Sequence, residues 1–178
     1  MSWIGHRPVR VGEIPPVFAA RDDTRVGARC DTRLNAQHTP GMVNISVRYT
    51  GELHCVATHG PSQAELATDA PADNMGKGEA FSPTDLVATA LATCMATTMG
   101  IAAHKHGIDL TGMTVQISKE MSKDAPRRIV GLPSEVHIPL RPDHPQRELL
   151  EHAALHCPVH KSLAPEINSP TKFVWEGL

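Results

Sequence analysis

The longest hydrophobic stretch of the chain, residues 86–103, carries no charged side chain and has helix signals at both ends. Ser82 can cap the first turn, and Asp85 stands three residues later, where it can complete a capping box. Gly107 follows basic residues, as is common at a helix C-terminus. Positions at helical spacing form one apolar face: Val87, Ala90, Leu91, Cys94, Thr98 and Ile101. The pattern predicts one long central helix with Cys94 in the middle of its buried face.

Alternating patterns surround this helix. Residues 43–49 place Val43, Ile45, Val47 and Tyr49 on one side, which predicts a half-buried strand. Further strands are expected at 53–58, 64–68, 111–121, 129–140 and 171–175. Residues 143–157 predict a second helix, with Asp143 as cap and an apolar face of Leu149, Leu150, Ala153 and Ala154. The order predicts an α+β domain with antiparallel sheets, a long central helix and a second helix.

Residues 1–41 differ from the rest of the chain. They are rich in proline and arginine and show no sustained periodicity. This composition predicts a poorly ordered N-terminal extension, followed by a single domain over residues 42–178. Cys30 lies in the extension, and neither it nor Cys55 receives a role, although Cys55 could be an additional redox thiol.

Charge and composition exclude several classes of function. The net charge of −2 and the isoelectric point near 6.6 do not favour a nucleic acid or an anionic membrane as partner. Aromatic residues make up only 3% of the chain, so a base-stacking surface is not expected. Residues 86–103 are rich in alanine and threonine, which favours a buried helix over a membrane span. The N-terminus has no apolar run typical of a signal peptide, and the four cysteines are irregularly spaced, which predicts reduced thiols in the cytoplasm.

Two cysteines lie in or at the end of the predicted helices: Cys94 and Cys157, the latter followed by Pro158. A buried free cysteine is often only a small apolar core residue. Two thiols can act together if the fold brings their Cα atoms within about 7 Å. In that case one thiolate can attack a peroxide and become a sulfenic acid. The other thiol can then condense with this sulfenic acid to form a disulfide.

The segments SPTDLVATALATC at 82–94 and HCPVHKSL at 156–163 resemble the OsmC/Ohr family of osmotically inducible and organic-hydroperoxide-resistance proteins. The resemblance covers the chain from about residue 42 onward. It implies the OsmC-like fold and an intertwined homodimer without a cofactor. It also implies that Cys94 is the peroxidatic cysteine and Cys157 the resolving cysteine. A dithiol such as dihydrolipoamide, or a lipoyl protein, would then reduce the disulfide.

Two positions depart from the family pattern. Peroxidase members carry a glutamate directly after the helix-start proline, where this chain has Thr84, and Asp85 is one place further on. One residue rotates a side chain by about 100° around a helix. The family also carries an arginine in the early strands. Its place falls near His54 in this chain, and Arg48 is the nearest arginine. Arg48, His54 or a group of the partner subunit are therefore the candidate cations for the thiolate of Cys94, and Asp85 is the candidate for the role of the family glutamate.

The substrate expected from this resemblance is an organic or lipid hydroperoxide. Leu91, Met95 and Met99 share the helix of Cys94 and are expected to line an apolar pocket beside it. Burying an alkyl tail there would contribute about 0.8 kcal/mol per CH₂. An alternative of another class is a non-catalytic protein that uses the pocket to bind a small apolar ligand.

Histidines suggest a third possibility. His152, His156 and His160 are four residues apart, a spacing that could present metal ligands on one helical face. Pro158 interrupts that register, so a solvated helix face is favoured and no metal site is predicted. The glycine-containing loop at 76–78 lacks the spacing of a phosphate-binding loop and is interpreted as a turn that could border the active site.

Overall fold

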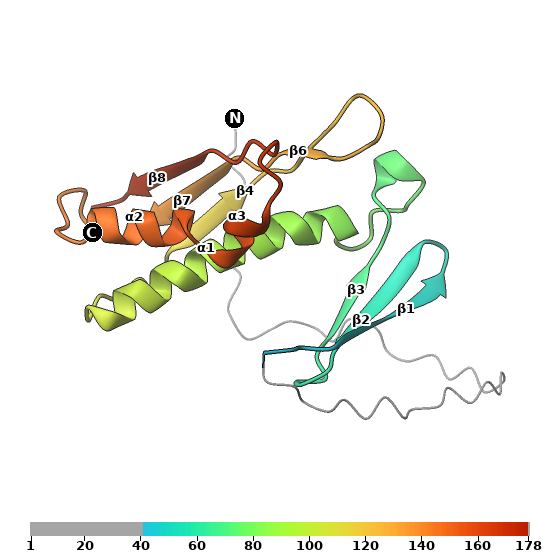
Figure 1. Cartoon of the computed structure of the whole chain (residues 1–178), viewed down its shortest axis with the longest axis horizontal. Coiled ribbons are helices and arrows are strands. Elements are labelled where there is room, and N and C mark those ends of the chain that lie inside the picture. Colours follow the sequence, from blue (N-terminus) through green and yellow to red (C-terminus); the bar gives the residue numbers. More distant parts are fainter. Residues whose placement is uncertain (1–40, 178) are drawn as a thin grey trace, which may run out of the picture. The chain divides into compact units, whose positions relative to one another are not determined.

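The computed structural model describes residues 41–177 of the chain. The predictions for the N-terminal extension and for Cys30 lie outside these residues. The elements, in chain order, are β1 (Ile45–Gly51), β2 (His54–His59), β3 (Glu65–Thr68), the short 3₁₀ helix η1 (Ala72–Asn74), α1 (Pro83–Lys105), β4 (Thr114–Ile117), β5 (Glu120–Met121), β6 (Ile129–Gly131), β7 (Ser134–Ile138), α2 (Arg147–Leu155), α3 (Pro158–Ser162) and β8 (Thr171–Trp175). The α+β class is therefore as predicted (Figure 1).

β1, β2 and β3 form an antiparallel sheet, as predicted, with β2 in the centre. The β1–β2 turn places Glu52 and Leu53 at φ of 48° and 67°, the left-handed conformation that two-residue hairpin turns require. The prediction that β1 is half-buried does not hold within the described part of the chain. Ile45, Val47 and Tyr49 are 64%, 64% and 62% exposed, and the polar residues between them are exposed as well. β1 pairs with β2 along one edge, and neither of its faces is covered.

The second three-stranded sheet has the order β4–β7–β8. β4 pairs with β7 antiparallel, but β7 pairs with β8 parallel, which corrects the expectation of purely antiparallel sheets. The physical reason is the connection between β7 and β8. Because α2 and α3 return the chain to the end of the sheet at which β7 begins, β8 runs in the same direction as β7. The predicted strands 111–121 and 129–140 are each divided in two. Pro133 separates β6 from β7, since proline has no N–H for a strand ladder.

The start of α1 is as predicted. The Ser82 side chain accepts a hydrogen bond from the Asp85 backbone, and the Asp85 side chain accepts one from the Ser82 backbone. The buried face, however, differs from the predicted one. It consists of Ala88, Leu91, Ala92, Met95, Met99 and Ala103. Of the predicted set only Leu91 is fully buried, Cys94 is partly buried, and Ile101 is 53% exposed. Because the helix is apolar on all sides, its sequence pattern could not identify the face that packs.

α1 is the centre of the core. It contacts α2, α3 and β4 (Figure 1). Its buried side chains join those of β7 and α2 in one cluster. By length and hydropathy alone α1 could cross a membrane, but its packing is that of a central helix in a folded domain.

α2 begins later than predicted. Asp143 does not cap it, because the carboxylate is held by the Arg141 guanidinium at 3.0 Å and the helix starts at Arg147. Leu150 and Ala154 are the buried residues of α2, whereas Leu149 is 38% exposed. After α2, Pro158 starts the separate helix α3.

Candidate functional site

Cys94 and Cys157 meet where α3 packs against α1. Cys94 lies in the middle of α1 and is partly exposed, whereas Cys157 is the N-cap residue of α3 and is completely buried. Both are free thiols in the same packed cluster, and Cys94 is close enough to influence the ionisation of Cys157. The structure thus brings together the two cysteines that the sequence singled out.

Burial raises the pKa of the Cys157 thiol above its ordinary value. The Cys94 thiol beside it acts in the same direction. The His160 backbone N–H donates to Sγ of Cys157 at 3.4 Å and lowers the pKa, but it does not outweigh burial. Cys157 is therefore a protonated thiol at neutral pH, next to the more accessible Cys94.

The predicted pocket residues Leu91, Met95 and Met99 are completely or almost completely buried in the core beside the cysteines. In the single chain they belong to the core and do not line an open cavity within the described residues. A shallow groove lies between α1 and α2, lined by Thr98, Ile101, Ala102, Lys105, His106, Leu149, Ala153 and His156. Its lining is mostly apolar, and Thr98 is one helical turn from Cys94.

Asp85 lies at the start of α1 in a polar cluster. The ammonium group of Lys119 contacts the Asp85 carboxylate and also donates to the hydroxyls of Thr84, at 3.0 Å, and Ser82, at 3.3 Å. Burial raises the pKa of Asp85, but the hydrogen bonds from Lys119 and Ser82 together lower it below its ordinary value. Asp85 is therefore ionised and occupied in fixing the start of the central helix.

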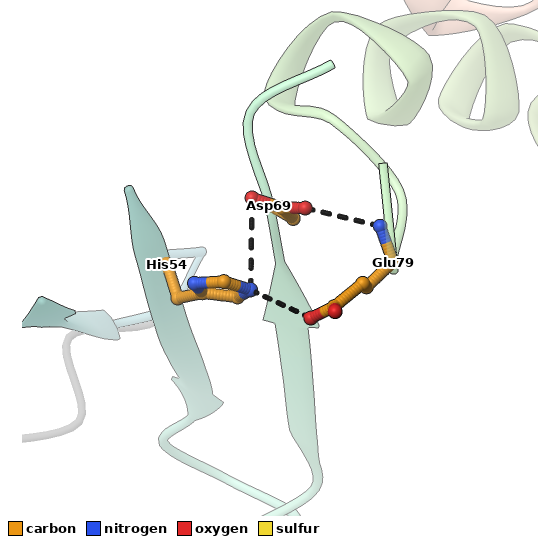
Figure 2. A group of neighbouring side chains, drawn as sticks. All are labelled: His54, Asp69 and Glu79. Atoms are coloured by element: carbon orange, nitrogen blue, oxygen red, sulfur yellow. Dashed lines mark hydrogen bonds and ion pairs between the residues drawn. The ribbon is translucent and has the colours of Figure 1, made fainter. Parts of the chain in front are cut away.

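Arg48 and His54 lie on the hairpin that precedes α1. Arg48 is exposed on β1, opposite Val56 of β2. His54 faces two carboxylates, those of Asp69 and Glu79, as Figure 2 shows. Within residues 41–177 no hydrogen bond or ion pair joins Arg48 or His54 to a cysteine, so a supporting role for either remains a prediction.

The three histidines near the end of α2 do not form a common ligand set. The rings of His152 and His156 stack with centroids 3.7 Å apart. Both ring nitrogens of His160 are in use, Nδ1 with the Leu155 carbonyl at 2.7 Å and Nε2 with Ser169 Oγ at 3.0 Å. The expected solvated helix face is seen for His152 and His156, which are exposed, but not for His160, which is partly buried.

Sequence reasoning missed three residues. Lys119 follows β4 and reaches the start of α1, while Asp69 and Glu79 lie at the two ends of the loop before α1. The loop was identified as rich in turn residues, but no local pattern indicates that it folds back to bring its two carboxylates together. Only tertiary structure reveals these contacts.

Comparisons with known proteins identify the family. The family model of the OsmC-like protein matches residues 76–172. The crystal structure of a protein from Psychrobacter arcticus 273-4, assigned to the osmotic stress induced and detoxification response, is 41% identical. The alignment covers 78% of this chain and 99% of that chain, with a TM-score of 0.69. No protein in a curated sequence set matches the chain.

More distant structures share the fold. The organic hydroperoxide resistance protein OsmC from Legionella pneumophila is 18% identical over 76% of this chain and 98% of that chain, with a TM-score of 0.60. An organic hydroperoxide resistance protein from Elizabethkingia anophelis is 15% identical over 79% and 99%, also with a TM-score of 0.60. The family model and the 41% identical relative together show that the chain belongs to the OsmC-like protein family.

Proposed function

We propose that this protein is a thiol-dependent peroxidase that reduces organic hydroperoxides through Cys94 and Cys157. One observation carries the proposal: a partly exposed cysteine in the central helix lies beside a completely buried one. This is the order of access that peroxidatic and resolving thiols require, because the peroxide must reach the first and be kept from the second. Membership of a family that includes organic hydroperoxide resistance proteins supports it.

The chemistry proceeds in two steps. The Cys94 thiolate attacks the distal oxygen of ROOH, the O–O bond breaks, and the alkoxide takes a proton to leave as ROH. Cys94 is then a sulfenic acid. The Cys157 sulfur attacks the Cys94 sulfur, its proton joins the departing hydroxide, and a disulfide and water result. A dithiol of the dihydrolipoamide type returns both cysteines to thiols by exchange.

The protonated state of Cys157 has a consequence for this sequence of steps. A buried neutral thiol is a poor nucleophile toward peroxide, so Cys157 does not compete with Cys94 for substrate. It reacts only after the sulfenic acid has formed next to it. The raised pKa supports the order of oxidation in this proposal, with Cys94 first.

The substrate class follows from the side chains around Cys94. Partly buried apolar side chains such as Val87 and Ala102 lie on the same helix, whereas Leu91, Met95 and Met99 are too deeply buried in the single chain to contact a substrate. An alkyl or aryl hydroperoxide would gain about 0.8 kcal/mol per buried CH₂ against hydrogen peroxide. Equal rates with hydrogen peroxide and cumene hydroperoxide would contradict this preference.

The working form in this proposal is a homodimer in the cytoplasm, where reducing conditions keep the cysteines available. The exposed apolar residues of β1, Ile45, Val47 and Tyr49, supply a surface that a second copy would cover. Sedimentation equilibrium should then give twice the mass of 19.2 kDa. Replacing Val47 by Lys should weaken association, because a charge would enter the covered surface.

The test is consumption of cumene hydroperoxide with dihydrolipoamide as reductant. Cys94→Ser should abolish turnover, whereas Cys157→Ser should retain the first step and then inactivate as Cys94 over-oxidises. Cys55→Ser is the matched control, since Cys55 is another free cysteine and lies on β2. Wild-type turnover no faster than that of Cys94→Ser would refute the peroxidase.

The alternative is a non-catalytic protein that binds a small apolar ligand. The absence of the family glutamate at Thr84, and the use of Asp85 in capping and in the contact with Lys119, favour it. The mostly apolar groove between α1 and α2 would be the binding surface. An inactive wild type that binds a hydrophobic fluorescent probe in competition with fatty acyl ligands would support this alternative.

A further inference from the structure

The loop between β3 and α1 folds back onto the start of β2 and gathers three potential metal ligands. Nε2 of His54 lies 3.6 Å from Oδ1 of Asp69 and 3.4 Å from Oε2 of Glu79 (Figure 2). One ligand atom from each residue lies within 4.8 Å of the others. Asp69 and Glu79 were not assigned to the cysteine site, and within residues 41–177 no hydrogen bond or ion pair joins His54 to a cysteine.

The orientation of His54 is set by the hairpin turn. Nδ1 is 2.8 Å from the Glu52 carbonyl oxygen, which can only accept, so Nδ1 must carry the proton. In the neutral ring Nε2 then has a free lone pair directed toward the two carboxylates. Metal-binding histidines have this arrangement, with the second ring nitrogen donating to a backbone carbonyl or a carboxylate.

The orientation of Asp69 is set by the loop. Its Oδ2 accepts the backbone N–H groups of Lys77, at 3.2 Å, and Glu79, at 3.0 Å. The loop is tightly folded at this point, since a Cβ on Gly76 would lie 1.7 Å from the Ala70 carbonyl oxygen. These contacts leave the other carboxylate oxygen, Oδ1, pointing at His54.

Asp69 Oδ1 is the observation that indicates a ligand. The Asp69 side chain is 0% exposed, and within residues 41–177 Oδ1 is a buried polar atom without a hydrogen-bond partner. A buried carboxylate oxygen without a partner is costly. A buried carboxylate oxygen that faces an imidazole nitrogen calls for a cation between them, either a metal ion or a proton on Nε2.

The distances fit a transition-metal ion. Zinc binds imidazole nitrogen at about 2.0–2.1 Å and carboxylate oxygen at about 2.0–2.2 Å, which places tetrahedral ligands about 3.3–3.5 Å apart. The two distances from Nε2 are close to this separation, and they are longer than the ~2.7–2.9 Å of a direct charged hydrogen bond. Two carboxylates and a neutral histidine also balance the charge of a divalent cation.

We propose that His54, Asp69 and Glu79 bind a divalent cation of the zinc type. The ion would tie the start of β2 to the end of β3 and to the loop that leads into α1. Lys77 does not prevent this, because its ammonium group is paired with Glu52 at 2.8 Å. Glu79 is 61% exposed, so a fourth coordination position faces water.

Zinc binding to the full-length, metal-stripped protein tests the site, measured by equilibrium dialysis in the presence of a competing chelator. The wild type should bind one Zn²⁺ per chain at this site. His54→Gln and Glu79→Gln should each weaken binding at least about tenfold. Glu79 is exposed, so its substitution should leave the fold intact. His59→Gln is the matched control, because His59 lies on the same strand and its Nδ1 is bound to Ser62, and binding should be unchanged.

Thermal unfolding gives a second readout. Excess Zn²⁺ should raise the Tm of the wild type and of His59→Gln, but not that of His54→Gln, because a ligand stabilises only the state that binds it. Wild-type affinity retained in His54→Gln and Glu79→Gln would overturn the proposal. Binding lost in Cys94→Ser instead would overturn it as well, since the thiols would then be the ligands. No binding to the wild type at micromolar Zn²⁺ would also overturn the proposal.

Discussion

The contact between Asp85 and Lys119 should be worth a measurable part of the stability of the domain. The Lys119 side chain is only 16% exposed, and it contacts a carboxylate that is itself 39% exposed. Asp85→Asn removes the charge but keeps an oxygen that can accept the Ser82 backbone N–H, so the capping box survives. The substitution therefore isolates the loss of the counter-charge for a mostly buried ammonium group.

The size of the effect can be bounded. Removing one partner from a fully buried ion pair costs about 3–5 kcal/mol, and a hydrogen bond to a charged group is worth about 1.5–3 kcal/mol. Because water reaches Asp85, the lower range applies, and Asp85→Asn should reduce the free energy of unfolding by about 1.5–3 kcal/mol. In a double-mutant cycle with Lys119→Met, the coupling energy should be about 1–2 kcal/mol.

The pH dependence of the free energy of unfolding gives an independent test of this contact. The pKa of Asp85 is lowered below its ordinary 3.8 in the folded protein, so its contribution is present above that value and lost as the pH falls through the folded pKa. In urea unfolding at fixed protein concentration, the difference between wild type and Asp85→Asn should be constant from pH 5 to 7 and shrink below about pH 4. A cost below about 0.5 kcal/mol, or the same cost in the Lys119→Met background, would refute the reasoning.

Three other substitutions test the packing. Met99→Ala should lower the free energy of unfolding by about 2–5 kcal/mol in urea titrations, because Met99 is completely buried in the core; a cost below 1 kcal/mol would mean that another face of α1 packs. Under reducing conditions the free energy of unfolding of the wild type should fall, relative to that of Cys157→Ser, as the pH rises above about 9. The reason is that the Cys157 thiol ionises at lower pH in the unfolded chain than in the folded protein, where its pKa is raised. Parallel curves of stability against pH would contradict this. Gly76→Ala should cost about 2–3 kcal/mol or more, because the added Cβ would meet the Ala70 carbonyl oxygen; an unchanged Tm would show that the loop relaxes freely.

Local signals in the sequence were enough to predict the start of the central helix. Ser82 and Asp85 form a capping box with partners three residues apart, and such contacts depend on the local chain alone. The last strand was predicted with its observed bounds, since Thr171–Trp175 is rich in the β-branched and aromatic residues that favour strands. The parallel pairing of β7 with β8 was not predictable in this way, because it depends on the path taken by α2 and α3.

For the candidate sites, too, local sequence patterns did not predict the contacts between distant residues. The two cysteines were singled out by their places in the predicted helices, but their roles as a pair rested on a family resemblance, since spacing along the chain says nothing about whether two helices pack together. The packed face of α1 could not be read from a helix that is apolar all around. Asp69 and Glu79 became visible as partners of His54 only when the loop was seen to fold back onto β2. Contacts between distant segments are set by tertiary packing, and no local pattern encodes them.

The most direct test of the proposed function is a single turnover without reductant. The reduced protein is mixed with one equivalent of cumene hydroperoxide, quenched by thiol alkylation, and mapped by mass spectrometry. The account predicts one disulfide between Cys94 and Cys157 in the wild type and an oxidised Cys94 without a disulfide in Cys157→Ser. Both cysteines recovered as alkylated thiols, with the hydroperoxide unconsumed, would contradict it.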